Sequence, residues 1–181
     1  MPWCEGKPVK PGIRRRVRIV AKNDVSVFPQ LPRDELGRPT SATYKDNFVL
    51  AEGKKWLYID HLPDKAEPKS DPQGEFPSQT FNNQLTIVCP DVGPEATAAI
   101  TPFLNTEVIV LVEDMYGRFR VFGNEDWGAR IAPSQALGQG ATGTSATTLA
   151  ITASDECSMP FYEGEIPTDD GTINEADGAG A

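Results

Sequence analysis

Cysteine and histidine are scarce in this sequence. Three cysteines (Cys4, Cys89 and Cys157) lie far apart without a CxxC pair, and His61 is the single histidine. This spacing supports neither a disulfide framework nor a zinc site, and it favours a reducing compartment. Ser–His and Cys–His catalysis both need a histidine base, but a lone histidine at the end of a strand-like run is far more often structural. We therefore expect no metal ligand, no cofactor and no catalytic residue.

Long hydrophobic runs are missing as well. The longest aliphatic run covers residues 108–112, far short of the roughly 20 residues that a membrane span needs. The N-terminus does not contain the apolar core of a signal peptide, so we expect a soluble chain without membrane contact. The 16 prolines and 16 glycines exclude a helix bundle or a coiled coil, because neither tolerates so many helix breakers.

Positive charge is concentrated in the first part of the chain. Residues 1–70 carry 14 basic and 9 acidic side chains, whereas residues 71–181 carry three basic and 17 acidic ones, for a total charge of −9. A basic segment favours nucleic-acid binding, but this one lacks interleaved aromatic residues, and the whole chain repels DNA. Two interpretations remain. Either the basic segment and the acidic tail are simply solvated, or the basic part of one copy faces the acidic part of the next.

Short runs with a two-residue apolar period alternate with turn residues along most of the chain. We expect strands over residues 14–20, 25–28, 47–51, 55–59, 80–88, 107–112, 118–122 and 147–153. A single helix is predicted over residues 94–100, because Pro94 and Glu95 suit a first helical turn. The strands at 47–51 and 55–59 are expected to pair as a hairpin around Gly53. Together these elements predict a mainly β fold, a β-sandwich or barrel of short antiparallel strands with one short flanking α-helix.

The remaining segments are predicted to lack regular structure. Residues 1–12 indicate an extended arm rich in proline and glycine, and residues 62–75 a charged loop. Residues 134–146 are flexible by composition. From residue 163 to residue 181 the chain is acidic and lacks the apolar density to pack, so we expect a flexible tail. The folded domain is therefore predicted over residues 13–162.

The strongest β signal is the hairpin at residues 107–122. Its outgoing strand is apolar on both faces, which predicts that both faces are covered. On the return strand Arg118, Arg120 and Phe122 share one face, opposite Phe119 and Val121. We take five apolar residues as candidates for a barrel-forming hairpin: Val108, Val110, Val112, Phe119 and Val121.

Three motifs look like functional sites but lack the required context. Residues 138–143 fit G-x-G-x-x-G letter for letter, but Pro-Ser-Gln precedes them and a β-patterned segment follows in place of the helix that a dinucleotide site requires. The Asp-Asp-Gly run at 169–171 lacks the frame of a calcium loop. The acidic pairs at 113–114 and 125–126 fall in turns, where carboxylates are common without any catalytic role. None of these motifs predicts a reaction.

The order of features resembles the tail tube (major tail) proteins of tailed bacteriophages and prophages, particularly those of gut Bacteroidetes. The resemblance covers about residues 13–162. It is carried by a basic first strand (14–20), an aromatic strand (54–58), an alanine-rich helix (94–100), the hairpin run VEDMYGRFRVFGN (112–124) and a final strand that ends in MPFY (159–162).

This resemblance implies a β-sandwich of which six copies close into a ring, and rings that stack into a hollow tube. The acidic lumen would conduct the genome, with DNA as non-specific cargo. The implied partners are further copies and other tail proteins (terminator, tape measure, baseplate and possibly a sheath), in a virion tail assembled in the bacterial cytoplasm. The charge pattern agrees, because a heterologous interface repeated head to tail makes rings and filaments. Arg14, Arg15, Arg16 and Arg18 are predicted to contact carboxylates on a neighbouring copy.

Other functions stay open at this point. A tail terminator or a head–tail connector would form one ring and stop. A carbohydrate- or protein-binding β-sandwich would use Trp3, Trp56 and Trp127 as a platform, although buried aromatics are the commoner fate of tryptophan. An enzyme comes last, because candidate acids and bases do not cluster on any element.

Overall fold

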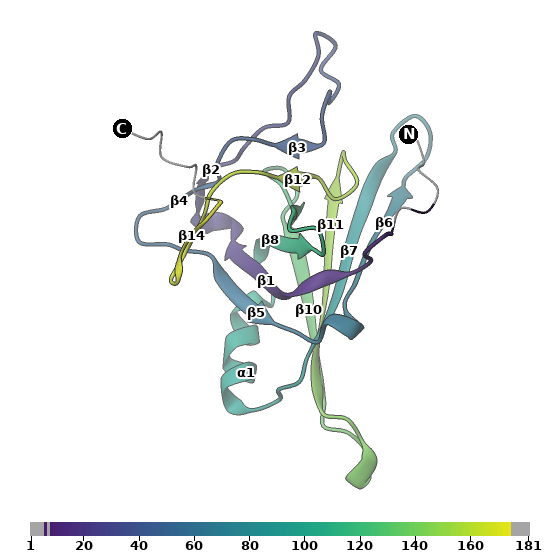
Figure 1. Cartoon of the computed structure of the whole chain (residues 1–181), viewed down its shortest axis with the longest axis vertical. Coiled ribbons are helices and arrows are strands. Elements are labelled where there is room, and N and C mark those ends of the chain that lie inside the picture. Colours follow the sequence, from purple (N-terminus) through teal and green to yellow (C-terminus); the bar gives the residue numbers. More distant parts are fainter. Residues whose placement is uncertain (1–5, 7, 175–181) are drawn as a thin grey trace.

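The computed structural model describes residue 6 and residues 8–174 (Figure 1). Strands make up 46% of the structure and helices 11%. The strands are β1 (Ile13–Ala21), β2 (Val25–Val27), β3 (Thr43–Tyr44), β4 (Val49–Leu50), β5 (Leu57–Asp60), β6 (Glu67–Gln73), β7 (Thr80–Cys89), β8 (Glu107–Asp114), β9 (Phe119–Phe122), β10 (Ala129–Ala136), β11 (Ala146–Asp155), β12 (Phe161–Tyr162), β13 (Ile166–Thr168) and β14 (Gly171–Ile173). The helices are α1 (Pro94–Ile100) and the short 3-10 turns η1 (Lys22–Asp24), η2 (Pro63–Lys65), η3 (Thr101–Phe103) and η4 (Gly140–Thr142).

A ten-stranded sheet holds most of these strands. Its order is β3-β12-β9-β8-β10-β11-β7-β6, with β1 paired to both β8 and β5. Strand β8 changes partner along its length, because residues 110–113 pair with β9 while Glu107 and Val108 pair with β10. The sheet therefore curls into a half-barrel with one short α-helix on its side. The mainly β sandwich or barrel predicted from the sequence is confirmed.

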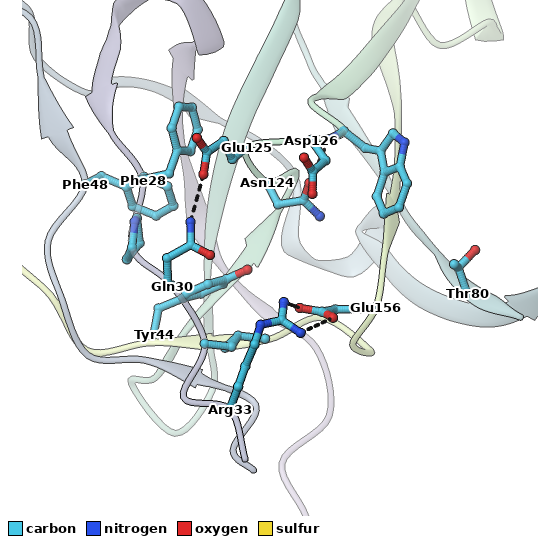
Figure 2. A pocket seen from close by; sticks show the side chains of 13 residues that line it. Phe28, Gln30, Arg33, Tyr44, Phe48, Thr80, Asn124, Glu125, Asp126 and Glu156 are labelled. Carbon is cyan, nitrogen blue, oxygen red and sulfur yellow. Dashed lines mark hydrogen bonds and ion pairs between the residues drawn. The ribbon is translucent and has the colours of Figure 1, made fainter. Parts of the chain in front are cut away.

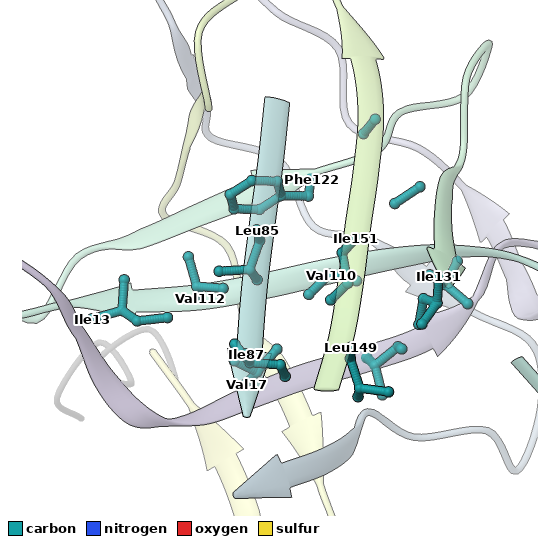
Figure 3. Close-up of a cluster of buried hydrophobic side chains, with 14 residues drawn as sticks. Ile13, Val17, Leu85, Ile87, Val110, Val112, Phe122, Ile131, Leu149 and Ile151 are labelled. Atoms are coloured by element: carbon teal, nitrogen blue, oxygen red, sulfur yellow. The ribbon is translucent and has the colours of Figure 1, made fainter. Parts of the chain in front are cut away.

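The main core lies between two crossing layers of this curled sheet (Figure 3). Val110 and Val112 from β8 face Leu85 from β7 and Ile151 from β11, and all four are buried. Each such buried aliphatic side chain contributes about 1.5–3 kcal/mol to the free energy of folding. This packing fixes the position of β8 against β7 and β11.

A second core covers the opposite face of β8. Ile109 and Leu111 pack there with aromatic side chains from loops and short strands, among them Phe48, Trp56 and Tyr162. Both faces of β8 are therefore covered, as the apolar run predicted. All five candidate hairpin residues, Val108, Val110, Val112, Phe119 and Val121, are buried, and the hairpin β8–β9 forms.

The hairpin predicted between residues 47–51 and 55–59 is wrong. The turn itself forms, since the Lys54 N–H donates to the Ala51 carbonyl, but β4 pairs with β2 and β5 pairs with β1. The buried side chain of Trp56 explains the separation. It packs against Phe48, and the Trp56 N–H donates to the Pro167 carbonyl, so the chain is drawn away from β4.

Two further segments predicted to be irregular form strands. Residues 62–75 contain β6, which pairs with β7 and carries Pro68 and Pro72 on the outermost strand of the sheet. Residues 166–173 form the hairpin β13–β14, and its Ile166 is fully buried in the second core. Strand β6 is held by its pairing with β7, and the β13–β14 hairpin is held by the burial of Ile166. The composition of each segment does not indicate these long-range contacts. The rest of the predicted tail, residues 175–181, lies outside the described residues.

The predicted arm at the N-terminus is described only in part. Residues 1–5 and 7 lie outside the described residues, and residues 8–12 have no regular secondary structure. The Lys10 N–H donates to the Tyr116 hydroxyl at 3.0 Å. His61, expected to be structural or on the surface, is buried, and its Nε2 lies 3.1 Å from the Arg14 carbonyl oxygen.

Candidate functional site

The four arginines predicted to contact a neighbouring copy differ in their surroundings. Arg14 is exposed and pairs with Glu113 at 2.7 Å. Arg15 is exposed, and its carbonyl accepts a hydrogen bond from the backbone N–H of His61. The sequence presents these arginines as one basic run, whereas the fold gives each a different exposure. Contact with a second copy stays a prediction for all four.

Arg16 and Arg18 project from the same face of β1 toward β5 and the turn of β13–β14. The Arg16 guanidinium donates to Asp60 at 2.9 and 3.3 Å and stacks on the Tyr58 ring at 3.9 Å. This guanidinium holds the pKa of the Asp60 carboxyl below its usual range. Arg18 is only 8% exposed and lies over the Phe119 ring at 5.1 Å. Arg18 is therefore part of the packed interior, and a charge reversal there would damage the monomer itself.

Two arginines, Arg118 just before β9 and Arg120 within it, stack on an aromatic ring that lies far from them in the sequence. Arg118 and Arg120 lie 4.9 and 4.1 Å from the Phe161 ring, because β9 pairs with β12. Arg118 also binds Asp114 at 2.8 Å. Burial raises the pKa of Asp114, but hydrogen bonds from the backbone N–H groups and the guanidinium outweigh it, so the pKa is lowered overall. Arg118 and Arg120 thus meet an aromatic ring from a distant part of the chain, in addition to Phe119 and Phe122 beside them in the sequence.

A polar pocket of about 170 Å³ lies at the turn between β9 and β10 (Figure 2). Gln30 donates to Glu125 at 2.8 Å, and Arg33 forms an ion pair with Glu156. Asp126 adds another carboxylate to the rim. The residues that line this pocket come from five separate stretches of the chain (28–33, 44–48, 80, 124–127 and 156), so no local sequence pattern predicts it.

Asp155, next to this pocket, is a fully buried carboxyl group. Its Oδ1 accepts the backbone N–H of Cys157 at 3.2 Å, and its Oδ2 has no partner within the described part of the chain. Burial raises the pKa of this carboxyl. A group whose pKa is higher in the folded state than in the unfolded state favours folding while it is protonated. For Asp155 this contribution is complete below the pKa of the unfolded state, near 3.8, and it is lost as the pH rises through the pKa of the folded state.

Asp155→Asn should therefore stabilise the protein at neutral pH. The substitution removes a charge that is costly to bury, so we expect the free energy of unfolding at pH 7 to rise by about 1 kcal/mol, measured by guanidinium denaturation. The gain should shrink as the pH approaches 4. Asp126→Asn, at an exposed rim position, is the control and should change little. A loss of stability in Asp155→Asn at pH 7 would contradict this account.

An exposed hairpin arm extends from the body of the molecule. The lower halves of β10 and β11 pair as far as Ala136 and Ala146, and the arm projects beyond the sheet (Figure 1). The sequence predicted a flexible stretch at residues 134–146, but its ends are paired strand and its tip contains η4. The GxGxxG look-alike forms this tip, between two strands that pair with each other. Leu137, at the start of the tip, is 77% exposed.

This hairpin arm also differs from the rest of the chain in charge. From Ile131 to Ser154 no side chain is charged. A two-stranded ribbon is at best marginally stable alone in water. Strand β7 pairs with β11 only as far as Thr147, so the end of the arm beyond it has no neighbouring strand, and an uncharged, exposed tip of this kind can pack on a second molecule.

Comparisons of the sequence with known protein families, with curated proteins and with solved structures find no match. Function is therefore inferred from the geometry of the chain. None of the helices in residues 8–174 is long and apolar enough to cross a membrane. Over the same residues, no three His, Cys, Asp or Glu side chains are grouped so that they hold a metal ion.

The three tryptophans do not make the sugar platform considered from the sequence. Trp56 is buried in the second core, and Trp127 is half-exposed at the polar pocket. Trp3 lies outside the described residues. A platform needs exposed rings side by side, so Trp56 has no part in one.

Proposed function

We propose that this chain is a structural subunit that assembles with copies of itself, as a tail tube protein of a bacteriophage does. The observation that carries the proposal is the uncharged hairpin arm of β10–β11, which projects from the body with its tip in solvent. The upper parts of β10 and β11 belong to the main core, whereas the described residues of the tip, between 137 and 145, are exposed. A second copy supplies the surface that covers it.

The shape of the molecule supports a head-to-tail arrangement. The loop that precedes β3 projects at one end of the longest axis, and the hairpin arm projects at the other (Figure 1). Leu36 in that loop and Leu137 on the arm are each 77% exposed. Two different surfaces at opposite ends suit a heterologous contact, and repetition of such a contact generates rings or filaments.

An apolar groove between β5 and α1 offers a further contact surface. It has a volume of about 390 Å³ and is lined by Leu57, Ile59, Ile100 and Phe103 among others. Leu57 is half-exposed. Exposed apolar surface of this kind marks an interaction site in a soluble protein, and it lies on the side of the sheet, between the two projecting ends.

Electron microscopy of the concentrated full-length protein tests the proposal. We expect negatively stained tubes of constant diameter, and a sedimentation profile that shifts to larger species as concentration rises. Discrete rings that never elongate would favour a terminator or connector. A chain that sediments as a monomer at every concentration tested would overturn the proposal.

A further inference from the structure

A small pocket lies beside β1, between β5 and the β13–β14 hairpin. Its volume is about 160 Å³, several times the roughly 30 Å³ that one water molecule occupies in the liquid. Arg16, Arg18 and Tyr58 form one wall, and residues 170–173 with Thr168 form the other. The hairpin β13–β14, which the sequence analysis did not predict, therefore creates this pocket.

Arg18 is a buried cation that forms no ion pair with any of the described residues. No described residue accepts a hydrogen bond from its guanidinium, and its Nη1 is inaccessible to solvent. The neighbouring carboxylates are already engaged, since Glu113 pairs with Arg14 at 2.7 Å and Asp60 pairs with Arg16 at 2.9 Å. Asp170, on the opposite wall, contacts Arg16 at 3.6 Å and is mostly exposed.

A guanidinium in this position stays charged. Burial lowers the pKa of Arg18, but arginine starts so high that it does not lose its proton in a protein. An unpaired buried charge is strongly destabilising, whereas a charge-assisted hydrogen bond to an oxyanion is among the stronger polar contacts. The pocket thus combines a cation that lacks a partner with the space for a small anion.

We propose that this pocket binds an oxyanion, a carboxylate or phosphate group that accepts hydrogen bonds from the Arg18 guanidinium. The planar fork of arginine matches two oxygens of either group. Arg16, held by Asp60, lies beside Arg18 and adds positive charge to the same wall. Asp170 opposes an entering anion from the rim. The site does not depend on self-association, so it stands whether or not the chain forms tubes.

Isothermal titration calorimetry of the full-length protein with phosphate and with acetate, at constant ionic strength, tests the site. We expect binding to wild type, a loss of at least about tenfold in affinity in Arg18→Met, and tighter binding in Asp170→Asn. Arg130→Met is the matched control, because Arg130 is an exposed arginine that pairs with Glu107 at 3.5 Å. It should bind like wild type.

Thermal unfolding provides a second measurement of binding that remains usable if a substitution changes the stability of the protein. Methionine keeps the contact with Phe119 and removes the unpaired charge, so Arg18→Met should melt about 2–5 °C higher than wild type in chloride. Saturating phosphate should raise the melting temperature of wild type and Arg130→Met by a few degrees more than that of Arg18→Met. Equal shifts in all three proteins would mean only a general salt effect and would overturn the proposal.

A competition experiment distinguishes the two possible sources of the anion, a second copy of the chain and a free oxyanion. If a carboxylate of a second copy occupies the pocket, phosphate and acetate should weaken self-association of wild type, and Arg18→Met should weaken it without them. If the ligand is a free oxyanion, both probes bind and self-association is unchanged. Absence of binding in wild type and in Asp170→Asn up to about 100 mM of either probe, with self-association insensitive to both probes, rejects the site.

Discussion

Removal of the tip of the hairpin arm should abolish assembly and leave the fold intact. Ala136 and Ala146 pair directly across β10 and β11, so residues 137–145 can be replaced by Asn-Gly, the two-residue turn that such a hairpin favours. The described side chains removed are mostly exposed, and we expect a melting temperature within about 3 °C of wild type. Sedimentation velocity and electron microscopy should show a single small species at concentrations where wild type polymerises.

A point variant separates the chemistry of the arm from its length. Leu137→Lys places a charge at the tip of an otherwise uncharged arm and should slow or stop polymerisation. Leu104→Lys changes an exposed leucine away from the arm (56% exposed) and serves as the matched control. Tubes of normal length from the shortened chain would show that the arm is not the contact and would remove the main support for the proposed function.

Gly123→Ala should cause a large loss of stability. Gly123 has φ = +94° at the point where β9 ends and the chain turns toward β10. A Cβ atom there would lie 2.7 Å from the Ala129 nitrogen and 2.9 Å from the Val108 carbonyl oxygen. Both are backbone atoms of the sheet, so no side-chain rotation relieves the clash. We expect the free energy of unfolding to fall by about 2–4 kcal/mol.

Guanidinium denaturation measures this loss, and Gly53→Ala provides the control. Gly53 also has a positive φ, +75°, but no heavy atom lies within 4 Å of the position of its added Cβ. Alanine at position 53 would have the strain of a positive φ but no steric clash, so we expect the free energy of unfolding to fall by about 1 kcal/mol. Equal losses in the two variants would show that crowding at the β9–β10 turn is not the cause.

The fold could be predicted where local sequence carries the signal. The apolar period of β1, β8, β9 and β11 and the proline-led start of α1 are properties of single segments, and these elements form as expected. Pairing between distant segments leaves no such mark. Strand β6 is charged and rich in proline, yet it is held by a full ladder with β7.

The candidate sites show the same limit. The basic run at residues 14–18 is visible in the sequence, but the burial of Arg18 depends on Phe119 and on the β13–β14 hairpin, far along the chain. The stacking of Arg120 on Phe161 likewise requires the pairing of β9 with β12. Side-chain environments that depend on such pairings can be identified only from the three-dimensional structure.

The two prolines of β6 have a consequence for aggregation. A proline is tolerated in a sheet where its nitrogen points away from the neighbouring strand, so Pro68 and Pro72 remove N–H donors from the open side of β6, the outermost strand of the sheet. That border is a poor template for an added strand. The folded chain is thereby protected against uncontrolled amyloid-like stacking along this border.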